Sequence, residues 1–278
     1  DHHLIVGQQR RGQRIALDPL EAFAIEPYFY IGDNDWANIK ERYEKDDIKE
    51  TLAELLMKYE LPYLEITEKE ALADYKNLKG VKWADLFIDK KWYSRSEYDW
   101  ELSDTLLRRL NVGNKASNYF QQANRWSVDG TISPGPLRTW TNKEFMITLM
   151  GSLFTMKAPR VEKSTIRSSI ALRKYICSQF KPNVAKVLYD KHQAKTVLDF
   201  SMGWGDRLAG FYASECTEKY IGIDPRKENH PIYKQQAEFY EKHRTFFEVD
   251  KSYDFICSPA EDADLSAYKE SVDLIMTS

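Results

Sequence analysis

The fold is decided by the stretch TVLDFSMGWGDRL, residues 196–208. Its first five residues are mostly apolar or β-branched, which predicts a buried strand over residues 196–200. A glycine-containing turn covers residues 201–207, and apolar residues from Leu208 onward begin a helix. Strand, tight turn and helix in this order form the first half of a βαβ unit, from which parallel sheets are built.

Three more short apolar runs follow along the chain. They cover residues 220–223, 253–257 and 272–276, and helical stretches separate the first of them from its neighbours. Strands that alternate with helices pair in parallel, because the connecting helix returns the chain to the same end of the sheet. The sequence therefore predicts an α/β domain over residues 194–278 with four strands of a Rossmann-like parallel sheet.

The turn after the first strand predicts a ligand site. Gly203 and Gly205 let the backbone turn sharply and approach a bound ligand closely. The dinucleotide pattern Gly-x-Gly-x-x-Gly is excluded because Leu208 occupies its last position, and no Gly-Lys-Ser/Thr follows, which excludes a phosphate loop. The turn is therefore expected to bind a nucleoside of another kind.

Asp224 directly follows the second predicted strand. An acid at this place in a parallel nucleotide-binding sheet accepts hydrogen bonds from ribose hydroxyls. A zwitterionic nucleoside fits the whole pattern. An acid near the first turn would face its ammonium group, Asp224 its ribose, and an acid after the third strand its adenine ring.

These motifs resemble those of the class I S-adenosylmethionine-dependent methyltransferases, over residues 197–278. Asp199, Phe200, Gly203 and Gly205 match the first motif of that family, and Asp224 matches the acid of its second motif. The stretch FSMGWGDRL is similar to that of phage and large-virus members. The resemblance implies the first four strands of a methyltransferase sheet and S-adenosylmethionine as the cofactor. The residues expected to bind this cofactor are Asp199, Phe200, Ser201, Gly203, Trp204, Gly205, Asp206, Asp224, Pro225, Glu261 and Asp262. Either Glu261 or Asp262 is the candidate for the adenine contact. Asp206 has the alternative role of capping the helix that follows it.

The final stretch DLIMTS, residues 273–278, resembles the start of the amino-methyltransferase signature Ser-Pro-Pro-aromatic. In that family the signature follows the fourth strand and holds the target exocyclic amine, so Ser278 is the predicted catalytic residue. The expectation is that Pro-Pro-aromatic follows in a longer protein and that the 278 residues alone transfer no methyl group. The alternative is that the match at Thr277 and Ser278 is accidental.

The distribution of charge predicts a polyanionic partner. Residues 105–195 contain 16 Lys and Arg against 4 Asp and Glu, a local net charge of +12, so the rest carries −15 of the total of −3. Such a basic segment is typical of nucleic-acid binding, and we expect DNA as the partner. The alternative is a solvated helical face that happens to be basic.

Aromatic residues, amides and arginines alternate in the same segment, as in NYFQQANRW at residues 118–126. Base stacking and base-edge hydrogen bonds need these residue types, although an ordinary domain edge also contains them. The candidate nucleic-acid contacts are Arg125, Trp126, Arg138, Trp140, Arg167, Arg173 and Lys174.

The chain is expected to have three segments. Residues 1–104 read as an acidic α+β region, 105–193 as a basic helical region and 194–278 as the α/β domain. In the first, one helix is expected over 39–59, closed by Pro62, and strands over 64–66 and 81–88. In both of the first two segments, capping boxes are expected to begin helices. The two capping boxes are Thr67 with Glu70 and Thr141 with Glu144. Ser164 and Asn183 are expected to cap further helices, and Pro182 is expected to end one.

Composition excludes several classes of protein. The counts of Gly (12) and Pro (10) are too low for a collagen-like or low-complexity chain. No apolar run reaches the ~18 residues of a membrane span. No signal peptide is recognised and the thiols are scattered, so the expected location is the cytoplasm, which for a viral protein is that of the host cell, and no disulfides are expected. The sequence indicates no oligomeric state. No metal site is expected from the three Cys and five His residues, which lack ligand spacing.

The leading hypothesis is a methyltransferase that acts on an exocyclic amine of a DNA base, adenine N6 or cytosine N4. The target base would be extruded from the duplex to reach the cofactor. One alternative is a methyltransferase of RNA or of a small molecule. The other is a nucleic-acid-binding module that retains a methyltransferase-like fold without catalysis.

Overall fold

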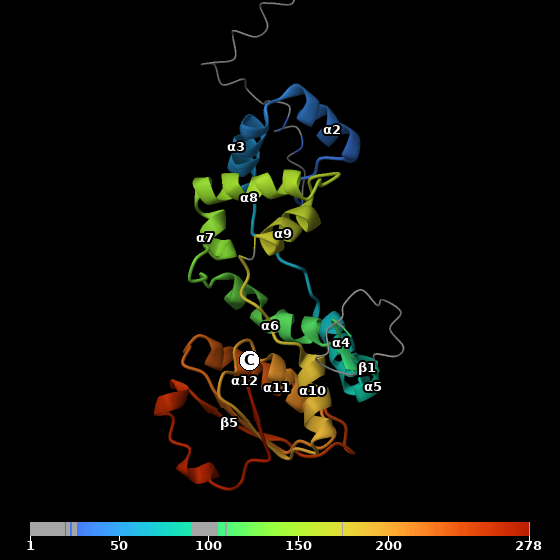
Figure 1. Ribbon diagram of the computed structural model, residues 1–278, viewed down its shortest axis with the longest axis vertical. Helices are drawn as coiled ribbons and strands as arrows, with labels where there is room; N and C mark the ends of the chain where they lie inside the picture. The colour runs from blue at the N-terminus through green and yellow to red at the C-terminus, as the bar shows by residue number, and fades with distance from the viewer. Residues whose placement is uncertain are drawn as a thin grey trace, which may run out of the picture. The chain divides into compact units, whose positions relative to one another are not determined.

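The computed structural model describes Leu20, Phe23 and residues 27–89, 105–108, 110–173 and 175–277. The chain forms two compact units, each assembled from separate stretches (Figure 1). The helical unit is Asp1–Tyr63 with Trp126–Cys177, and the sheet unit is Leu64–Arg125 with Ser178–Ser278. These bounds differ from the segments 1–104, 105–193 and 194–278, because each hydrophobic core draws on stretches that are distant in sequence.

The helical unit consists of short helices around one apolar core. Its elements are α2 (Asp33–Arg42), α3 (Lys45–Leu56), α7 (Pro136–Trp140), α8 (Lys143–Thr155) and α9 (Lys163–Leu172). Helix α8 packs against both α3 and α9 (Figure 1). Trp36 is fully buried in this core and donates from Nε1 to the carbonyl of Ala158 at 3.0 Å.

The single helix expected over residues 39–59 is two helices in the structure, α2 and α3. Tyr43 and Glu44 between them have extended backbone, with ψ of 151° and 143°. The apolar residues continue in register through the break because both helices bury one side in the same core. Hydrophobic spacing alone therefore does not reveal the break.

The first part of the sheet unit contains α4 (Glu68–Gly80), α5 (Trp83–Leu86), β1 (Phe87–Asp89), β2 (Thr105–Leu107) and α6 (Asn114–Trp126). Strands β1 and β2 form an antiparallel pair in which Phe87 faces Leu107. Of the strand expected over 81–88, only Phe87 and Ile88 are strand, in β1, whereas residues 83–86 form helix α5; residues 64–66 form no strand. Both expectations rested on apolar runs too short to distinguish a strand from other buried backbone.

The second part contains the sheet predicted from the sequence. Its elements are α10 (Pro182–Lys191), β3 (Thr196–Asp199), α11 (Asp206–Ala213), β4 (Lys219–Ile223), α12 (Asn229–Lys242), β5 (Ser252–Ile256), the 3-10 turns η2 (Ala260–Asp262) and η3 (Ser266–Tyr268), and β6 (Leu274–Met276). All four strands are parallel, in the order β5-β4-β3-β6. The α/β class and the parallel pairing are confirmed, and the sheet is compatible with a Rossmann-like fold.

Helices cover one face of this sheet. Helix α10 packs on α11, α11 packs on α12, and α4 contacts both α10 and α11 (Figure 1). Gly210 permits the contact between α10 and α11, because a Cβ there would lie 2.7 Å from that of Ala185 and 2.8 Å from the nitrogen of Lys186. On the other face, Leu198 and Ile221 pack against side chains from the chain between β5 and β6.

Several helix starts differ from the expected caps. The capping box of Thr67 and Glu70 at α4 is confirmed. Helix α8, however, is capped by Asn142, whose side chain accepts from the Phe145 amide at 3.1 Å. Helix α9 begins after Glu162, whose amide donates to Thr165, so Ser164 lies inside the first turn.

Pro182 begins helix α10 instead of ending a helix. Proline is favoured at this position because the first helical residues have no intrahelical partner for an N–H group. Asn183, expected as a cap, lies inside the same helix and is buried. Its side-chain amide donates to the carbonyls of Leu110 and Val112 at 3.1 and 3.0 Å. It therefore fixes the segment before α6 onto α10.

Across the described ranges, none of the helices combines the length and apolar character that crossing a membrane requires.

Candidate functional site

The order of the strands places the candidate site. The chain runs outward from β3 through β4 to β5 and then returns to the other side of β3 as β6. In such sheets ligands bind outside the carboxyl ends of the strands, at the point where this direction changes. That point lies between β3 and β6, and there the hydroxyls of Ser201 and Thr277 are 2.9 Å apart.

The turn after β3 is fixed by hydrogen bonds from both sides. The Met202 amide donates to the carbonyl of Ile223 at 3.1 Å, which joins the turn to the end of β4. The carbonyl of Gly203 accepts from the Asn229 side-chain amide at 2.9 Å and from the Tyr233 hydroxyl at 2.5 Å. Both contacts come from α12, so the first turns of this helix hold the loop in one conformation.

Asp224 lies beside this turn and is nearly buried, with 6% of its surface exposed. One carboxylate oxygen accepts from the Gly203 amide and the other from the Arg226 amide, each at 2.9 Å. The Asn229 side-chain amide is 3.5 Å from the second of these oxygens. Because each carboxylate oxygen accepts about two hydrogen bonds, Asp224 retains capacity for about one more donor, at the oxygen that accepts from Gly203.

Asp199 has a different environment. It is fully buried, and the Arg207 guanidinium donates to its two oxygens at 2.8 and 3.0 Å. The Tyr220 hydroxyl and the Ser201 amide complete its contacts at 2.5 and 3.1 Å. Breaking a buried ion pair such as Asp199 with Arg207 costs about 3–5 kcal/mol. Asp199 therefore stabilises the turn after β3. In this geometry its carboxylate is directed at Arg207.

The two glycines of the turn have positive φ, 58° at Gly203 and 70° at Gly205, but different surroundings. A Cβ at Gly203 would meet only the carbonyl of Ser201, at 3.7 Å, so the space beside it is open. A Cβ at Gly205 would lie 2.3 Å from the side-chain oxygen of Gln236. Close approach by a ligand is therefore possible at Gly203, whereas Gly205 makes room for α12.

Asp206 is the first residue of α11 and is buried, with 2% of its surface exposed. Its Oδ1 accepts from the Ser117 hydroxyl and, at 2.6 Å, from the Gln179 side-chain amide. Among the described residues its Oδ2 has no hydrogen-bond partner. Burial raises the pKa of Asp206 from 3.8 to about 6, although these two hydrogen bonds and the nearby Arg125 act in the opposite direction. Its contacts join α6 to the turn.

A network of amides extends from the turn along α6 and α12. Asn124 donates to Asn229 at 2.7 Å and accepts from Arg226 at 3.1 Å. Gln121 donates to Gln236 at 3.1 Å. Sequence reasoning missed these residues as part of the site. Asn124 and Asn229 are 105 positions apart, and only the paired tertiary contacts connect them.

The remaining predicted cofactor residues lie at the same edge of the sheet with more exposure. Phe200 is 38% exposed directly after β3, and Pro225 is exposed after Asp224. Trp204 is half-buried and donates from Nε1 to the carbonyl of Ser178 at 3.0 Å. Glu261 and Asp262 are exposed in η2, which follows β5. Ser278, the predicted catalytic residue, lies outside the described residues.

The tryptophans predicted to stack on bases are in the interior of the helical unit. Trp126 is 2% exposed and packs against Tyr63 with ring centroids 5.0 Å apart. Trp140 is 6% exposed and donates from Nε1 to the carbonyl of Tyr59 at 2.7 Å. Neither ring is presented to a nucleic acid in this structure, because both complete the core.

The predicted basic contacts also have protein partners. Arg125 is 9% exposed and donates to Gln179 and Asn118, and Arg167, half-buried, donates to backbone carbonyls at residues 62 and 63. Arg173 is exposed and joins α9 to α8 through Ser152 and Thr148. Arg138 is exposed, with Asp129 at 3.6 Å. Lys174 lies outside the described residues.

Together, the fold and this edge define an α/β domain with a parallel sheet and a preorganised turn at its switch point. No group of His, Cys, Asp or Glu among the described residues is arranged to hold a metal ion. No protein-family model matches the chain, and neither a curated protein nor a solved structure shows significant similarity to it.

Proposed function

We propose that the protein is an S-adenosylmethionine-dependent methyltransferase that modifies an exocyclic amine of a DNA base. One observation carries the proposal. Asp224 accepts the amide of Gly203 at 2.9 Å while the space beside Gly203 is open, at the switch point of a parallel sheet. An acid and an accessible backbone turn in this relation suit a nucleoside ligand.

Some of the residues predicted to bind S-adenosylmethionine are placed where they could contact it, and Asp199 is not. Asp224 would accept a ribose hydroxyl, and Gly203 would let the cofactor approach the backbone. Phe200 offers an exposed ring after β3, and Glu261 and Asp262 are exposed carboxylates after β5. Asp199, by contrast, is engaged by Arg207 and would act by holding the turn.

When bound, S-adenosylmethionine supplies an electrophilic methyl group. The task of the protein is then to position a poor nucleophile, since the lone pair of an exocyclic amine is delocalised into the base. From the family resemblance, Ser278 and the carbonyls beside it would accept hydrogen bonds from the amine and orient its lone pair. Held in this way, the amine and the methyl group meet as if in a unimolecular reaction, which is a large part of the rate enhancement.

DNA is proposed as the substrate because of the charge distribution. Residues 105–195 carry a net charge of +12, and exposed arginines such as Arg138 belong to this segment. A polyanion would bind there through its phosphates, which requires cationic side chains but no stacking tryptophan.

Calorimetry with S-adenosylmethionine tests the cofactor. We expect Gly203→Val to abolish binding because its side chain fills the open space. Asp224→Ala should weaken binding about tenfold to a hundredfold, the scale for hydrogen bonds to a charged acceptor. Asp250→Ala is the matched control, since this carboxylate is 95% exposed and follows α12. Unchanged affinity in a folded Gly203→Val protein would refute the proposed cofactor site.

Tritium transfer from the cofactor to unmodified DNA, followed by mass spectrometry of the nucleosides, tests the reaction in the full-length protein. Label on adenine N6 or cytosine N4 is the expected result. Label on RNA or on a small molecule would support another methyltransferase. Cofactor binding without transfer to any of these would indicate a binding module, and a methyl group on carbon 5 of a pyrimidine would contradict the amine mechanism.

A further inference from the structure

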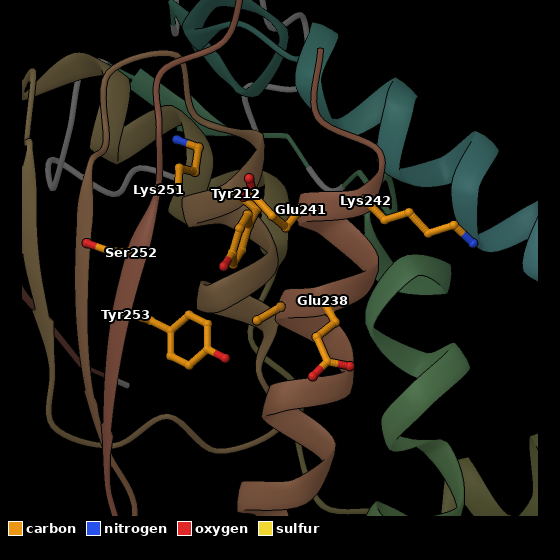
Figure 2. Close-up of a pocket in the computed structure, with 8 residues that line it drawn as sticks. Tyr212, Glu238, Glu241, Lys242, Lys251, Ser252 and Tyr253 are labelled. Carbon is orange, nitrogen blue, oxygen red and sulfur yellow. The ribbon is translucent and has the colours of Figure 1, made fainter. Parts of the chain in front are cut away.

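A pocket separate from the candidate cofactor site lies between α11, α12 and β5 (Figure 2). Its volume is about 460 Å³, within the range of small-molecule sites. Residues 251–253 line it at the start of β5, whereas the candidate cofactor site is at the carboxyl ends of the strands. The length of the strand, ~13 Å, separates the two.

Two tyrosines form the walls of this pocket. Tyr212 is 3% exposed and its ring packs on Phe211 and Tyr240. Tyr253 stacks on Phe255 with ring centroids 4.2 Å apart and an angle of 17° between the planes. These contacts fix both rings, so the pocket has rigid aromatic sides.

The hydroxyl of Tyr212 lines this pocket without a hydrogen-bond partner among the described residues. Burial and, after it, the charge of Glu241 raise the pKa of Tyr212, while the charge of Arg244 acts in the opposite direction. The hydroxyl therefore remains available to a molecule in the pocket.

Two carboxylates complete the lining. Glu238 and Glu241 lie three residues apart on α12 and so on one side of the helix. Oε1 of Glu241 accepts from the Arg244 guanidinium at 2.7 Å. Its Oε2 is buried and has no partner within the described part of the chain. Since an unpaired buried carboxylate oxygen is costly, this atom favours a donor from a ligand.

The ammonium groups of the two nearby lysines lie outside the space between the tyrosines. The ammonium of Lys251 donates to the carbonyls of Ser214 and Thr217 at 3.0 and 2.7 Å and to the Thr217 hydroxyl at 2.8 Å. The Lys251 ammonium is therefore bound by the residues that follow α11. The side chain of Lys242 extends away from the space between the tyrosines (Figure 2).

We propose that this pocket binds an organic ammonium ion whose apolar body lies between Tyr212 and Tyr253. The ammonium group would donate to Glu238, to Oε2 of Glu241 and to the Tyr212 hydroxyl. The faces of the tyrosine rings would add an attraction to the cation and cover its carbon atoms. A carboxylate or phosphate ligand is disfavoured by the same two glutamates.

Calorimetry on the full-length protein with 2-phenylethylammonium tests this site, with neutral 2-phenylethanol as the comparison. We expect the cation to bind at least tenfold more tightly than the alcohol. The double variant Glu238→Gln and Glu241→Gln should remove this preference, and Tyr212→Phe should weaken binding of the cation severalfold. Glu228→Gln, at the start of the same helix, is the control that removes a carboxylate elsewhere and leaves the preference unchanged.

Equal affinity for the cation and the alcohol, or a preference that persists in the double variant, would overturn the proposal. Thermal unfolding and S-adenosylmethionine binding are measured on every variant. Cofactor binding is expected to be unchanged by the substitutions at Glu238, Glu241 and Tyr212, since the pocket is separate from the carboxyl edge, and the unfolding measurement shows whether each variant is folded. The two binding measurements are therefore independent: failure to bind S-adenosylmethionine would not contradict the ammonium site, and failure to bind the ammonium ion would not contradict the cofactor site.

Discussion

At the scale of single residues, the two glycines of the turn are expected to respond differently to the same substitution. Gly203→Ala should cost about 1–2 kcal/mol, the strain of a left-handed conformation, because the space for its Cβ is open. Gly205→Ala should cost roughly 2 kcal/mol more, because its Cβ would also meet the buried amide of Gln236. Denaturant unfolding of the two variants measures both changes.

The combination of Gly205→Ala with Gln236→Ala is the control for this comparison. If the clash with Gln236 is the cause, the double variant recovers part of the loss, whereas independent effects would add. Equal destabilisation by the two single substitutions would contradict the difference in packing.

Asp206 predicts a particular dependence of stability on pH. Burial raises its pKa from 3.8 to about 6, so the folded protein binds a proton that the unfolded chain has released between these values. The contribution of protonated Asp206 to the free energy of unfolding is therefore fully present below pH ~4 and is lost as pH rises through ~6. Relative to Asp206→Asn, the native protein should lose up to about 3 kcal/mol across this range.

The measurement is the free energy of unfolding of both proteins at several values of pH. Other titrating groups are common to the two and cancel in the difference. Asparagine keeps an oxygen that can accept from Ser117 and Gln179, so the variant retains the contacts of α6. A difference that does not vary between pH ~4 and ~6 would show that Asp206 is not buried as an acid.

At the scale of elements, the start of α8 distinguishes two neighbouring residues. Asn142→Ala should destabilise the helical unit by about 1 kcal/mol, because it removes the acceptor for the Phe145 amide. Thr141→Ala should change stability by less than about 0.5 kcal/mol, since Thr141 is exposed and bonds only to the carbonyls of the preceding helix. Thermal unfolding of the two variants provides the comparison, and the reverse order would place the cap at Thr141.

The elements also show which parts of the fold a sequence predicts. The strands at 196–200, 220–223, 253–257 and 272–276 were predicted within about two residues, because buried parallel strands are local apolar runs. The starts of α8 and α9 were misplaced because several polar residues compete to cap a helix, and tertiary packing selects one.

The candidate site was predictable to a similar extent. Gly203 and Asp224 are adjacent in space as the spacing of the strands indicated. The burial of Trp126 and Trp140 was not predictable, because an amphipathic aromatic has the same local sequence whether it faces a core or a ligand. The amide pair of Asn124 and Asn229 joins stretches too distant for any periodicity to connect.

At the scale of the whole molecule, the basic segment predicts a steep dependence of DNA binding on salt. Affinity should fall at least about tenfold from about 50 to about 200 mM salt, as phosphate contacts release counterions. Arg138→Glu should weaken binding at low salt, because this side chain is exposed. Trp140→Phe should lower stability and leave DNA affinity unchanged, since Trp140 is buried and bonded to Tyr59.

Gel-shift titrations at several salt concentrations measure these effects. A flat salt response would favour a solvated basic face over a nucleic-acid surface. The fragment 105–192 is not suited to this test, because it contains pieces of both compact units and completes the core of neither. The experiment therefore uses the full chain.

The interleaved division of the chain has a consequence for synthesis on the ribosome. The helical unit gains its last core residue, Tyr175, while residues 64–125 are already outside the ribosome. During that interval α4 and α6 expose apolar side chains whose partners in α10 to α12 have not yet left the ribosome. The segment 64–125 would thus form a temporary loop, closed by the folded helical unit and open to chaperones. Slowing translation after residue 177 should prolong its sensitivity to protease, which pulse-labelling of nascent chains would detect.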